Sequence, residues 1–240
     1  RSLVGSEMCI RDSYRGGLIM KLGILTSIFG NYNFEQVLDM TSEFGLECME
    51  VACWPQGEGE RRYAGVCHID CENFTDEEAH TIINKCEEKK IFISALGFYA
   101  NLMDENLEKR KENIQHFMKV IDVSAKLNIN MVTGFLGRMQ HKTLEENLKA
   151  VKEIWTPIIH YAESKKVRIA IENCPMLFTQ DEWPGGQNIM TSPDNWRKIF
   201  EILDSDYFGI NYDPSHFVWQ QMDYIRPVSY THLRAHETPE

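Results

Sequence analysis

Residues 167–175 read VRIAIENCP, an apolar run that ends abruptly at a carboxylate, Glu172. Valine and isoleucine dominate the run, and β-branched residues of this kind favour a strand. Because the run is apolar at consecutive positions, we expect both faces of the strand to be covered, as in a parallel sheet. A charged group that ends such a strand must be paired, hydrated or bound to a metal ion. The stretch therefore predicts a buried parallel strand with a reactive carboxylate at its carboxyl end.

Short apolar runs of the same kind recur along the chain, and amphipathic stretches with a helical period separate them. The other runs are KLGILTS (21–27), ECMEVAC (47–53), IFISALGF (91–98), NMVTGFL (130–136) and YFGINYD (207–213). Helix start signals lie between them: Asn33 as an N-cap, Thr75 with Glu78 as a capping box, and Ser192 followed by Pro193. This alternation predicts an α/β fold with a parallel sheet.

Two architectures fit the alternation, a doubly wound open sheet and a (β/α)8 barrel. The sequence has no G-x-G-x-x-G motif after the first strand and no P-loop, which argues against a nucleotide-binding open sheet. Polar residues gather instead at the carboxyl ends of several predicted strands, where barrel enzymes build their active sites. We therefore expect the barrel.

A second strand end carries a similar pattern. In FGINYDPSHF (208–217), Asp213 closes the strand and His216 follows three residues later. Carboxylates at neighbouring strand ends would point into one mouth and repel each other, and a divalent cation between them relieves this repulsion. Carboxylates with an imidazole suit manganese, magnesium, cobalt or zinc. The alternative is structural, with Glu172 as a helix cap and the Asp-Pro-Ser sequence as a simple turn.

Four segments around these residues resemble a known family. They are IAIENCPM (169–176), GGQNI (185–189), TSPDNWRKIFE (191–201) and NYDPSHFVWQ (211–220). Together they look like the sugar phosphate isomerase/epimerase family, whose fold is a xylose isomerase-like TIM barrel. The resemblance covers about residues 20–227 and is specific for the superfamily rather than for one substrate. It implies an incomplete (β/α)8 barrel of the xylose isomerase-like type, with about six βα units present.

The resemblance also implies roles for individual residues. Glu172 matches the strand-end glutamate that binds the metal and transfers a proton, and Asp213 matches the metal-binding aspartate. His216 matches the histidine that contacts a substrate oxygen near the metal. The family's remaining His and Glu ligands lie on later strands, which this chain lacks. The implied reaction is isomerisation or epimerisation of a small sugar or sugar phosphate, by proton transfer next to a carbonyl through an enediolate.

Two further residues are weaker candidates for substrate binding. In VCHIDCENF (66–74), His68 and Asp70 alternate onto one face of an extended segment and would face the pocket. Arg138, after the fourth predicted strand, could meet a phosphate or a carboxylate. The alternatives are a surface loop around His68 and a solvated arginine at 138.

Composition limits the partners and the compartment. The chain has 240 residues, a net charge of -11 and 43% hydrophobic residues. This is enough for a sizeable core, and the acidic balance argues against nucleic acid or an anionic membrane as the main partner. No apolar run is long enough to span a membrane and no signal-peptide pattern precedes Met20. We expect a cytoplasmic protein with a small-molecule substrate, and the sequence leaves a homo-oligomer open.

The cysteines fit the same compartment. No C-x-x-C motif occurs, and without a secretory signal we expect reduced thiols. Cys67 and Cys71 flank His68 and suggest zinc, but the sequence offers no fourth ligand nearby. Buried free thiols are the simpler interpretation.

Both ends of the chain carry a signature of non-native DNA. Residues 1–12, read backwards as antisense codons, are compatible with residues 228–239 at every position. This pattern resembles an adapter of the kind used to build sequencing libraries, and the alternative is a genuine inverted repeat. We therefore interpret 1–19 as a non-native leader, 20–227 as a truncated barrel domain and 228–240 as a non-native tail.

Other functions stay open on the same fold. An endonuclease of the AP-site repair type has similar metal ligands but needs a basic DNA-facing groove, which the net charge of -11 opposes. A dehydratase of inositol-type substrates is also compatible. The chain could also be a non-catalytic fragment, because an incomplete barrel exposes strand edges and apolar surface. For the chain as written we expect poor solubility or no activity.

Overall fold

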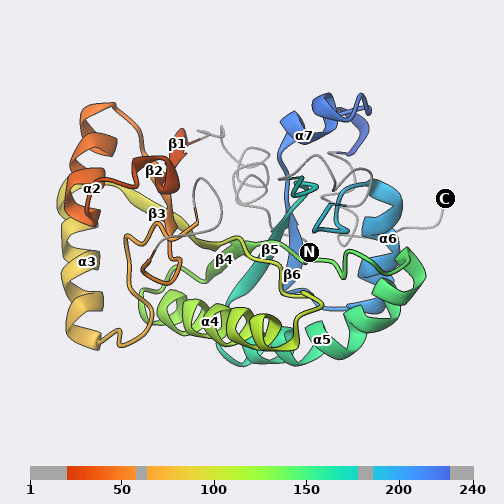
Figure 1. Ribbon diagram of the computed structural model, residues 1–240. Coiled ribbons are helices and arrows are strands. Elements are labelled where there is room, and N and C mark those ends of the chain that lie inside the picture. The colour runs from red at the N-terminus through yellow and green to blue at the C-terminus, as the bar shows by residue number, and fades with distance from the viewer. Residues whose placement is uncertain (1–20, 58–63, 178–185, 228–240) are drawn as a thin grey trace.

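The computed structural model describes residues 21–57, 64–177 and 186–227 of the chain, and Figure 1 shows its elements. The strands are β1 (Gly23–Leu25), β2 (Cys48–Ala52), β3 (Phe92–Phe98), β4 (Met131–Gly134), β5 (Arg168–Glu172) and β6 (Phe208–Asn211). The helices are η1 (Thr26–Phe29), α2 (Phe34–Glu43), α3 (Asp76–Lys89), α4 (Leu107–Lys126), α5 (Leu144–Ser164), α6 (Pro193–Ile202) and α7 (Pro214–Trp219). Each predicted apolar run contains one strand.

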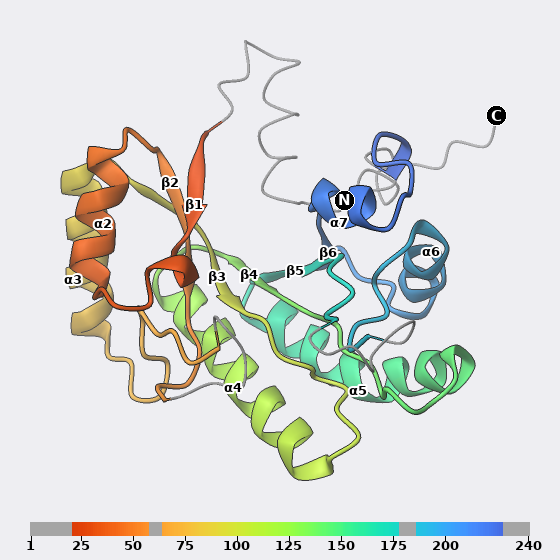
Figure 2. The same cartoon turned by 45° about the horizontal axis from the view of Figure 1, so that its top comes forward.

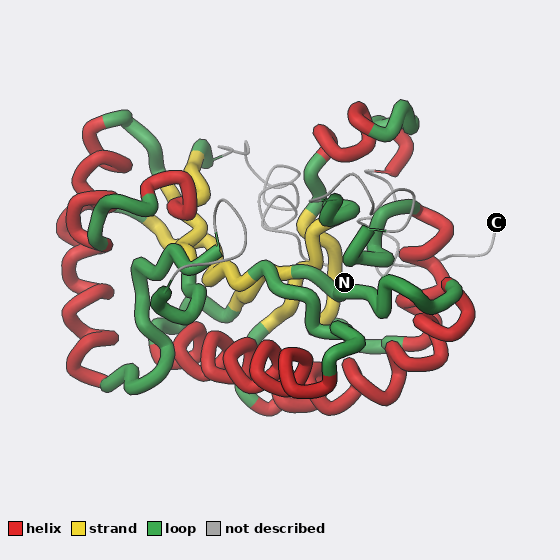
Figure 3. Tube along the Cα trace, viewed as in Figure 1, coloured by secondary structure: helices red, strands yellow, loops and turns green. Residues whose placement is uncertain are grey.

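The strand order decides between the two architectures. All pairs are parallel, and the order β1-β2-β3-β4-β5-β6 follows the chain without a reversal. A doubly wound sheet would reverse its order at a switch point, whereas a barrel adds each βα unit beside the last. Figures 2 and 3 show the strands on the inner side with helices α2 to α6 arranged around them. The expected α/β fold, an incomplete barrel, is confirmed, with six strands in the part of the chain that the structure describes.

Local sequence signals set the helix boundaries. Asn33 and Thr75 each accept a hydrogen bond from the third residue of the following helix, α2 or α3, whose side chain returns the bond. Ser192 caps α6 in a simpler way, with one bond from the backbone of the first turn. These caps satisfy N–H groups that a first helical turn leaves without partners. Helix α5 continues through Pro157.

A buried tryptophan joins the helical layer to the sheet. Trp155 of α5 is fully buried, with ring centroids 6.0 Å from Phe117 of α4 and 5.8 Å from Phe208 of β6. Its indole N–H donates to the backbone oxygen of Leu136 at 3.0 Å, so the polar atom of the ring is satisfied. This contact ties α4 and α5 to the first residue of β6.

Strands β1 and β6 form the two edges of the sheet. Large hydrophobic side chains near both edges are exposed, namely Leu22 and Ile28 beside β1 and Val218, Trp219 and Ile225 after β6. This distribution fits the expectation that an open sheet leaves apolar surface uncovered. Among the described residues, the helices are too short or too polar to cross a membrane.

Candidate active site at the carboxyl ends of β5 and β6

Glu172 is the last residue of β5, where a buried strand meets the open end of the sheet. Residues 169–171 are buried, whereas the Glu172 side chain keeps 19% of its surface exposed. Parallel pairing places Glu172 opposite Asn211, the last residue of β6. The sequence analysis placed Glu172 at a strand end, and the structure puts it there.

Asp213 and His216 lie directly after β6, at the start of α7. The Asp213 carboxylate caps α7 by accepting a hydrogen bond of 2.8 Å from the Ser215 N–H. His216 lies in the first turn, with Nε2 2.9 Å from Glu172 Oε1 and 3.4 Å from Asp213 Oδ2. The chain thus brings together the three residues that the two sequence motifs singled out.

The imidazole of His216 is the positive partner in this group. Burial lowers its pKa, but hydrogen bonds and charge interactions with Cys174 and Glu172 outweigh burial and raise the pKa to about 10. In the metal-free protein the protonated imidazole is therefore favoured and donates to Glu172, and His216 would have to release this proton to bind a metal ion. The sequence suggested that the carboxylates of Glu172 and Asp213 would repel each other. The positive charge of His216, which lies close to both, offsets this repulsion.

A donor set suited to a metal ion forms around this pair. Ligand atoms of Glu172, Cys174 and His216 all lie within 4.8 Å of one another. A carboxylate, a thiol and an imidazole are the donor types that bind divalent transition metals, so these residues fit the implied ion. In the described parts of the chain this is the one such group, and Cys67, His68 and Cys71 do not form another.

Two buried asparagines hold the backbone of the site. The Asn173 amide donates to the Asp213 carbonyl at 2.8 Å and accepts from the Asp213 N–H at 2.7 Å, so it joins the ends of β5 and β6. Asn188 donates to the carbonyls of Glu172 at 3.0 Å and Cys174 at 2.7 Å. These bonds fix the backbone positions of Glu172, Cys174 and Asp213.

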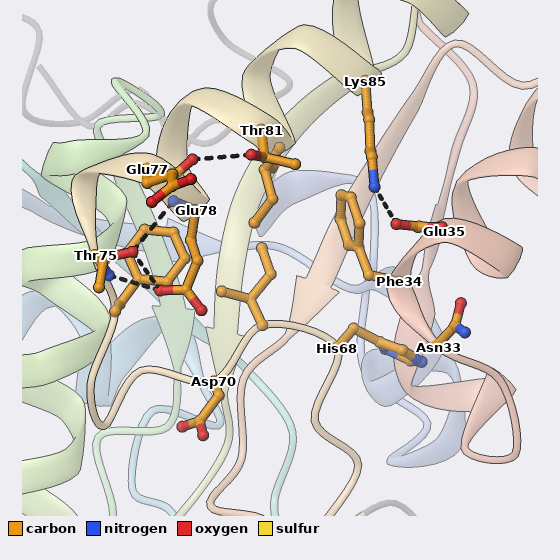
Figure 4. Close-up of a pocket in the computed structure, with 13 residues that line it drawn as sticks. Asn33, Phe34, Glu35, His68, Asp70, Thr75, Glu77, Glu78, Thr81 and Lys85 are labelled. Carbon is orange, nitrogen blue, oxygen red and sulfur yellow. Dashed lines mark hydrogen bonds and ion pairs between the residues drawn. The ribbon is translucent and has the colours of Figure 1, made fainter.

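His68 lies apart from this centre, at the carboxyl ends of β1 and β2. Its Nδ1 is 2.9 Å from the Thr26 hydroxyl and its Nε2 is 3.3 Å from the Phe29 carbonyl oxygen. Burial lowers the pKa of His68, which keeps the ring neutral at pH 7. His68 and Asp70 line a cavity of about 600 Å³ between α2 and α3 (Figure 4), away from the Glu172 cluster.

Arg138 follows β4, the strand beside β5. Its backbone N–H donates to Asn101 Oδ1 at 2.9 Å, and its carbonyl accepts from Asn101 Nδ2 at 2.8 Å. Burial lowers the pKa of the guanidinium. A substrate-binding role for Arg138 and His68 stays a prediction. Residues 178–185, in the glycine-containing loop between β5 and α6, lie outside the described residues.

The structure also shows a polar network that sequence reasoning missed. Glu50 on β2 accepts hydrogen bonds from the Tyr99 hydroxyl and, at 2.7 Å, from the Thr133 hydroxyl. Asn211 donates to the Tyr99 oxygen at 3.3 Å, so the network reaches β6. Gly97 makes room for it, because a Cβ there would lie 2.8 Å from Glu50 Oε1.

The environment of Glu50 favours its neutral form. Burial raises its pKa to about 7, hydrogen bonds from Tyr99 and Thr133 lower it in part, and the charge of Glu172 raises it. The sequence did offer a signal here, since Glu50 is the one charged residue inside the strand CMEVA. A carboxyl in that position requires neutralisation or hydrogen-bond donors.

Comparison with known proteins agrees with this fold. Residues 38–237 match the model of the xylose isomerase-like TIM barrel family. The chain belongs to this family. No curated protein matches the sequence.

Solved structures with the same fold include sugar-converting enzymes. A D-tagatose 3-epimerase-like protein is 17% identical, with 89% of this chain and 72% of that chain covered and a TM-score of 0.65. An L-ribulose 3-epimerase is 13% identical, with 85% and 64% covered and a TM-score of 0.63. The probable 3-DHS dehydratase AsbF from Bacillus anthracis is 15% identical, with 89% and 70% covered and a TM-score of 0.64. At these identities the likeness shows the fold.

Proposed function

We propose that this protein is a metal-dependent isomerase or epimerase of a small sugar or sugar phosphate. The observation that carries the proposal is the cluster of Glu172, Cys174 and His216, with ligand atoms within 4.8 Å of one another. The cluster lies at the carboxyl ends of the strands, where barrel enzymes act. The similar structures of a D-tagatose 3-epimerase-like protein and an L-ribulose 3-epimerase support a sugar as substrate.

Glu172 is the residue that we assign to proton transfer. Its carboxylate accepts a proton from the carbon next to the substrate carbonyl. In the free protein it is hydrogen-bonded to the cationic His216 at 2.9 Å. When His216 turns its N–H to a substrate oxygen, Glu172 loses this donor and becomes a stronger base.

The metal ion that we propose is divalent manganese, magnesium, cobalt or zinc, with Glu172 and Asp213 as carboxylate ligands. Asp213 borders the cluster, since its Oδ2 lies 3.4 Å from His216 Nε2. When bound, such an ion polarises the carbonyl oxygen as a Lewis acid and so acidifies the neighbouring C–H. The buried amides of Asn173 and Asn188 hold the ligand positions and limit the reorganisation that binding requires.

A dehydratase is the second candidate, because proton removal next to a carbonyl also begins the elimination of water. The structural likeness to the probable 3-DHS dehydratase AsbF supports this second reaction. An endonuclease of the AP-site type is less well supported, since a net charge of -11 opposes binding to a phosphate backbone.

The proposed proton transfer can be tested by solvent exchange. The protein is incubated with Mn²⁺ in D2O and a panel of ketopentoses, ketohexoses and their phosphates, and proton NMR follows the hydrogen next to the carbonyl. We expect this hydrogen to be replaced by deuterium. In Glu172→Gln the exchange should slow roughly 10²–10⁴-fold, the usual contribution of a general base. Exchange at one carbon requires only one base, so the assay reports on Glu172 alone and does not require the complete isomerisation, for which we expect no activity in this chain.

The matched control is Glu201→Gln, which removes an exposed carboxylate of α6 and should leave exchange unchanged. Equal exchange in Glu172→Gln and the unaltered protein would remove Glu172 from the mechanism. If the unaltered protein binds Mn²⁺ but exchanges no sugar of the panel, the sugar assignment is wrong.

A further inference from the structure

We propose that Cys174 supplies a thiolate ligand to this metal centre, so that the site selects a thiophilic ion such as zinc or cobalt over magnesium. The inference rests on the proposed metal-dependent function and extends it, because the sequence motifs assign only carboxylates to the ion. It changes both the ligand set and the expected metal.

The position of Cys174 follows from the strand that carries Glu172. Residues two apart in an extended segment project to the same side, so Cys174 lies on the side of Glu172. Ligand atoms of both residues and of His216 fall within 4.8 Å of one another. Asp213, the expected second carboxylate, lies outside this set of three: its Oδ1 accepts from the Ser215 N–H at 2.8 Å, while its Oδ2 borders the set at 3.4 Å from His216 Nε2.

Hydrogen bonds to the backbone and to the sulfur of Cys174 hold the residue in this position. Its carbonyl accepts a hydrogen bond of 2.7 Å from the buried amide of Asn188. Its Sγ lies 3.4 Å from the N–H of Met176. The sulfur is also a hydrogen-bond partner of His216. Metal ligands are commonly oriented by hydrogen bonds from neighbouring groups, and the thiol of Cys174 already has such bonds.

Other thiols of the chain differ in their surroundings. Burial raises the pKa of Cys67 to about 12 and that of Cys86 to about 11. Neither belongs to a group of potential metal ligands in the described residues. Cys174 alone among the described thiols combines partial exposure with a carboxylate and an imidazole beside it.

The chemistry of the ligands sets the metal preference. Thiolates are soft donors that favour zinc and cobalt, whereas magnesium prefers oxygen ligands and keeps its waters. On binding, a sulfur–metal bond forms and the S–H bond breaks, and the proton leaves to solvent.

The test is a titration of the 240-residue protein with Co²⁺, followed in the near ultraviolet, where a thiolate–cobalt bond gives a charge-transfer band. Binding is measured in parallel by calorimetry. We expect the band in the unaltered protein and in Cys67→Ser, and its loss in Cys174→Ser. Co²⁺ affinity should fall in Cys174→Ser by at least the roughly 10-fold that loss of an outer-shell partner costs. Mg²⁺ in excess should not displace Co²⁺ from the unaltered protein.

The outcomes separate this inference from the proposed function. Co²⁺ binding without the band, or a band that persists in Cys174→Ser, overturns the thiolate ligand and leaves the carboxylate centre standing. An absence of Co²⁺ binding overturns the thiolate ligand and the metal centre together. Loss of the band in Cys174→Ser with Co²⁺ still bound, more weakly, supports the assignment and rules out unfolding as the cause.

Discussion

Glu50 on β2 and Glu172 on β5 are two carboxylates on strands of one parallel sheet, and their surroundings differ in kind. Glu50 accepts hydrogen bonds from two neutral hydroxyls, those of Tyr99 and Thr133. Glu172 lies at a strand end with 19% of its side chain exposed and pairs with the cationic His216 at 2.9 Å. Both carboxyls are partly buried, but the first has only neutral hydroxyl partners on neighbouring strands, whereas the second has a cationic partner at the end of its strand.

The comparison teaches how a barrel can separate structural from reactive carboxylates. Burial raises the pKa of Glu50 to about 7, so the carboxyl is far more often protonated at neutral pH than an exposed glutamate. Glu172 instead keeps a partner that can be exchanged for a ligand, because His216 sits on a separate helix at the rim. We therefore expect Glu50 to matter for stability and Glu172 for function.

The largest expected effect on stability is that of Glu50→Ala. Two buried hydroxyl donors would lose their acceptor and a cavity would remain, so the free energy of unfolding should fall by about 4 kcal/mol. Glu172→Ala should lower it by about 1 kcal/mol, since the partly exposed His216 can deprotonate or turn to Asp213. Urea unfolding of both variants measures the difference. Equal losses of stability in the two variants would contradict the assignment of Glu50 to stability and Glu172 to function.

Glu50 should also make stability depend on pH. Its folded pKa of about 7 lies above the ordinary value of 4.5, so the folded state binds the proton more tightly. The stability that this provides is complete below pH 4.5 and is lost as the pH rises through 7. The total is about 3 kcal/mol, from the shift in pKa.

Glu50→Gln isolates this contribution, because the amide oxygen can accept the same hydrogen bonds but does not titrate. The measurement is urea unfolding of both proteins at intervals from pH 4.5 to pH 8. The difference between the two curves should move in favour of Glu50→Gln as the pH rises toward 8. A difference that does not change with pH would show that Glu50 is charged in the folded protein throughout.

Gly97→Ala should have an intermediate effect. Its Cβ would lie 2.8 Å from Glu50 Oε1, 3.0 Å from a Tyr99 ring carbon and 3.2 Å from Thr133 Oγ1. The crowding should displace the Glu50 network and lower the free energy of unfolding by about 2 kcal/mol. Thermal or urea unfolding measures this loss of free energy. A variant as stable as the unaltered protein would show that the side chains around Glu50 can move to accept the added methyl group.

The smallest expected effect is that of Thr133→Val, a change of nearly constant shape that removes one donor to Glu50. We expect a loss of about 1 kcal/mol. The pKa of Glu50 should rise further, since the Thr133 bond lowers it. Ser94→Ala is the control, because the Ser94 hydroxyl donates to the Met49 carbonyl instead. A downward shift of the pKa in Thr133→Val would contradict the hydrogen-bond assignment.

The sequence predicted the fold and part of the site. Alternating apolar runs and helix caps predicted the βα order, and the carboxylate that ends VRIAIE marked the last residue of β5. Asp213 and His216 were predicted to join Glu172, because carboxyl ends of neighbouring parallel strands meet at one edge of a sheet. The fold and the proximity of these three residues could be predicted because periodicity and strand direction determine them, whereas the roles of the residues stay predictions.

The rest depends on side-chain directions and loop paths, which a linear pattern does not contain. Glu50 was read as one residue of an apolar run, and its partners Tyr99 and Thr133 come from two other strands. The role of Asn188 depends on the return of a loop to the carbonyls of Glu172 and Cys174. A thiol close to a glutamate in sequence is common, and only the position of His216 makes Cys174 a candidate ligand.

The most direct test of the central claim compares deuterium incorporation from D2O into the sugar in Glu172→Gln and Glu50→Gln. Both changes remove one carboxylate from the same sheet and keep its shape and hydrogen-bond acceptor. We predict that Glu50→Gln retains nearly the full exchange rate and that Glu172→Gln loses it roughly 10²–10⁴-fold. The opposite result, or equal losses in both variants, would contradict the division between a structural and a reactive carboxylate.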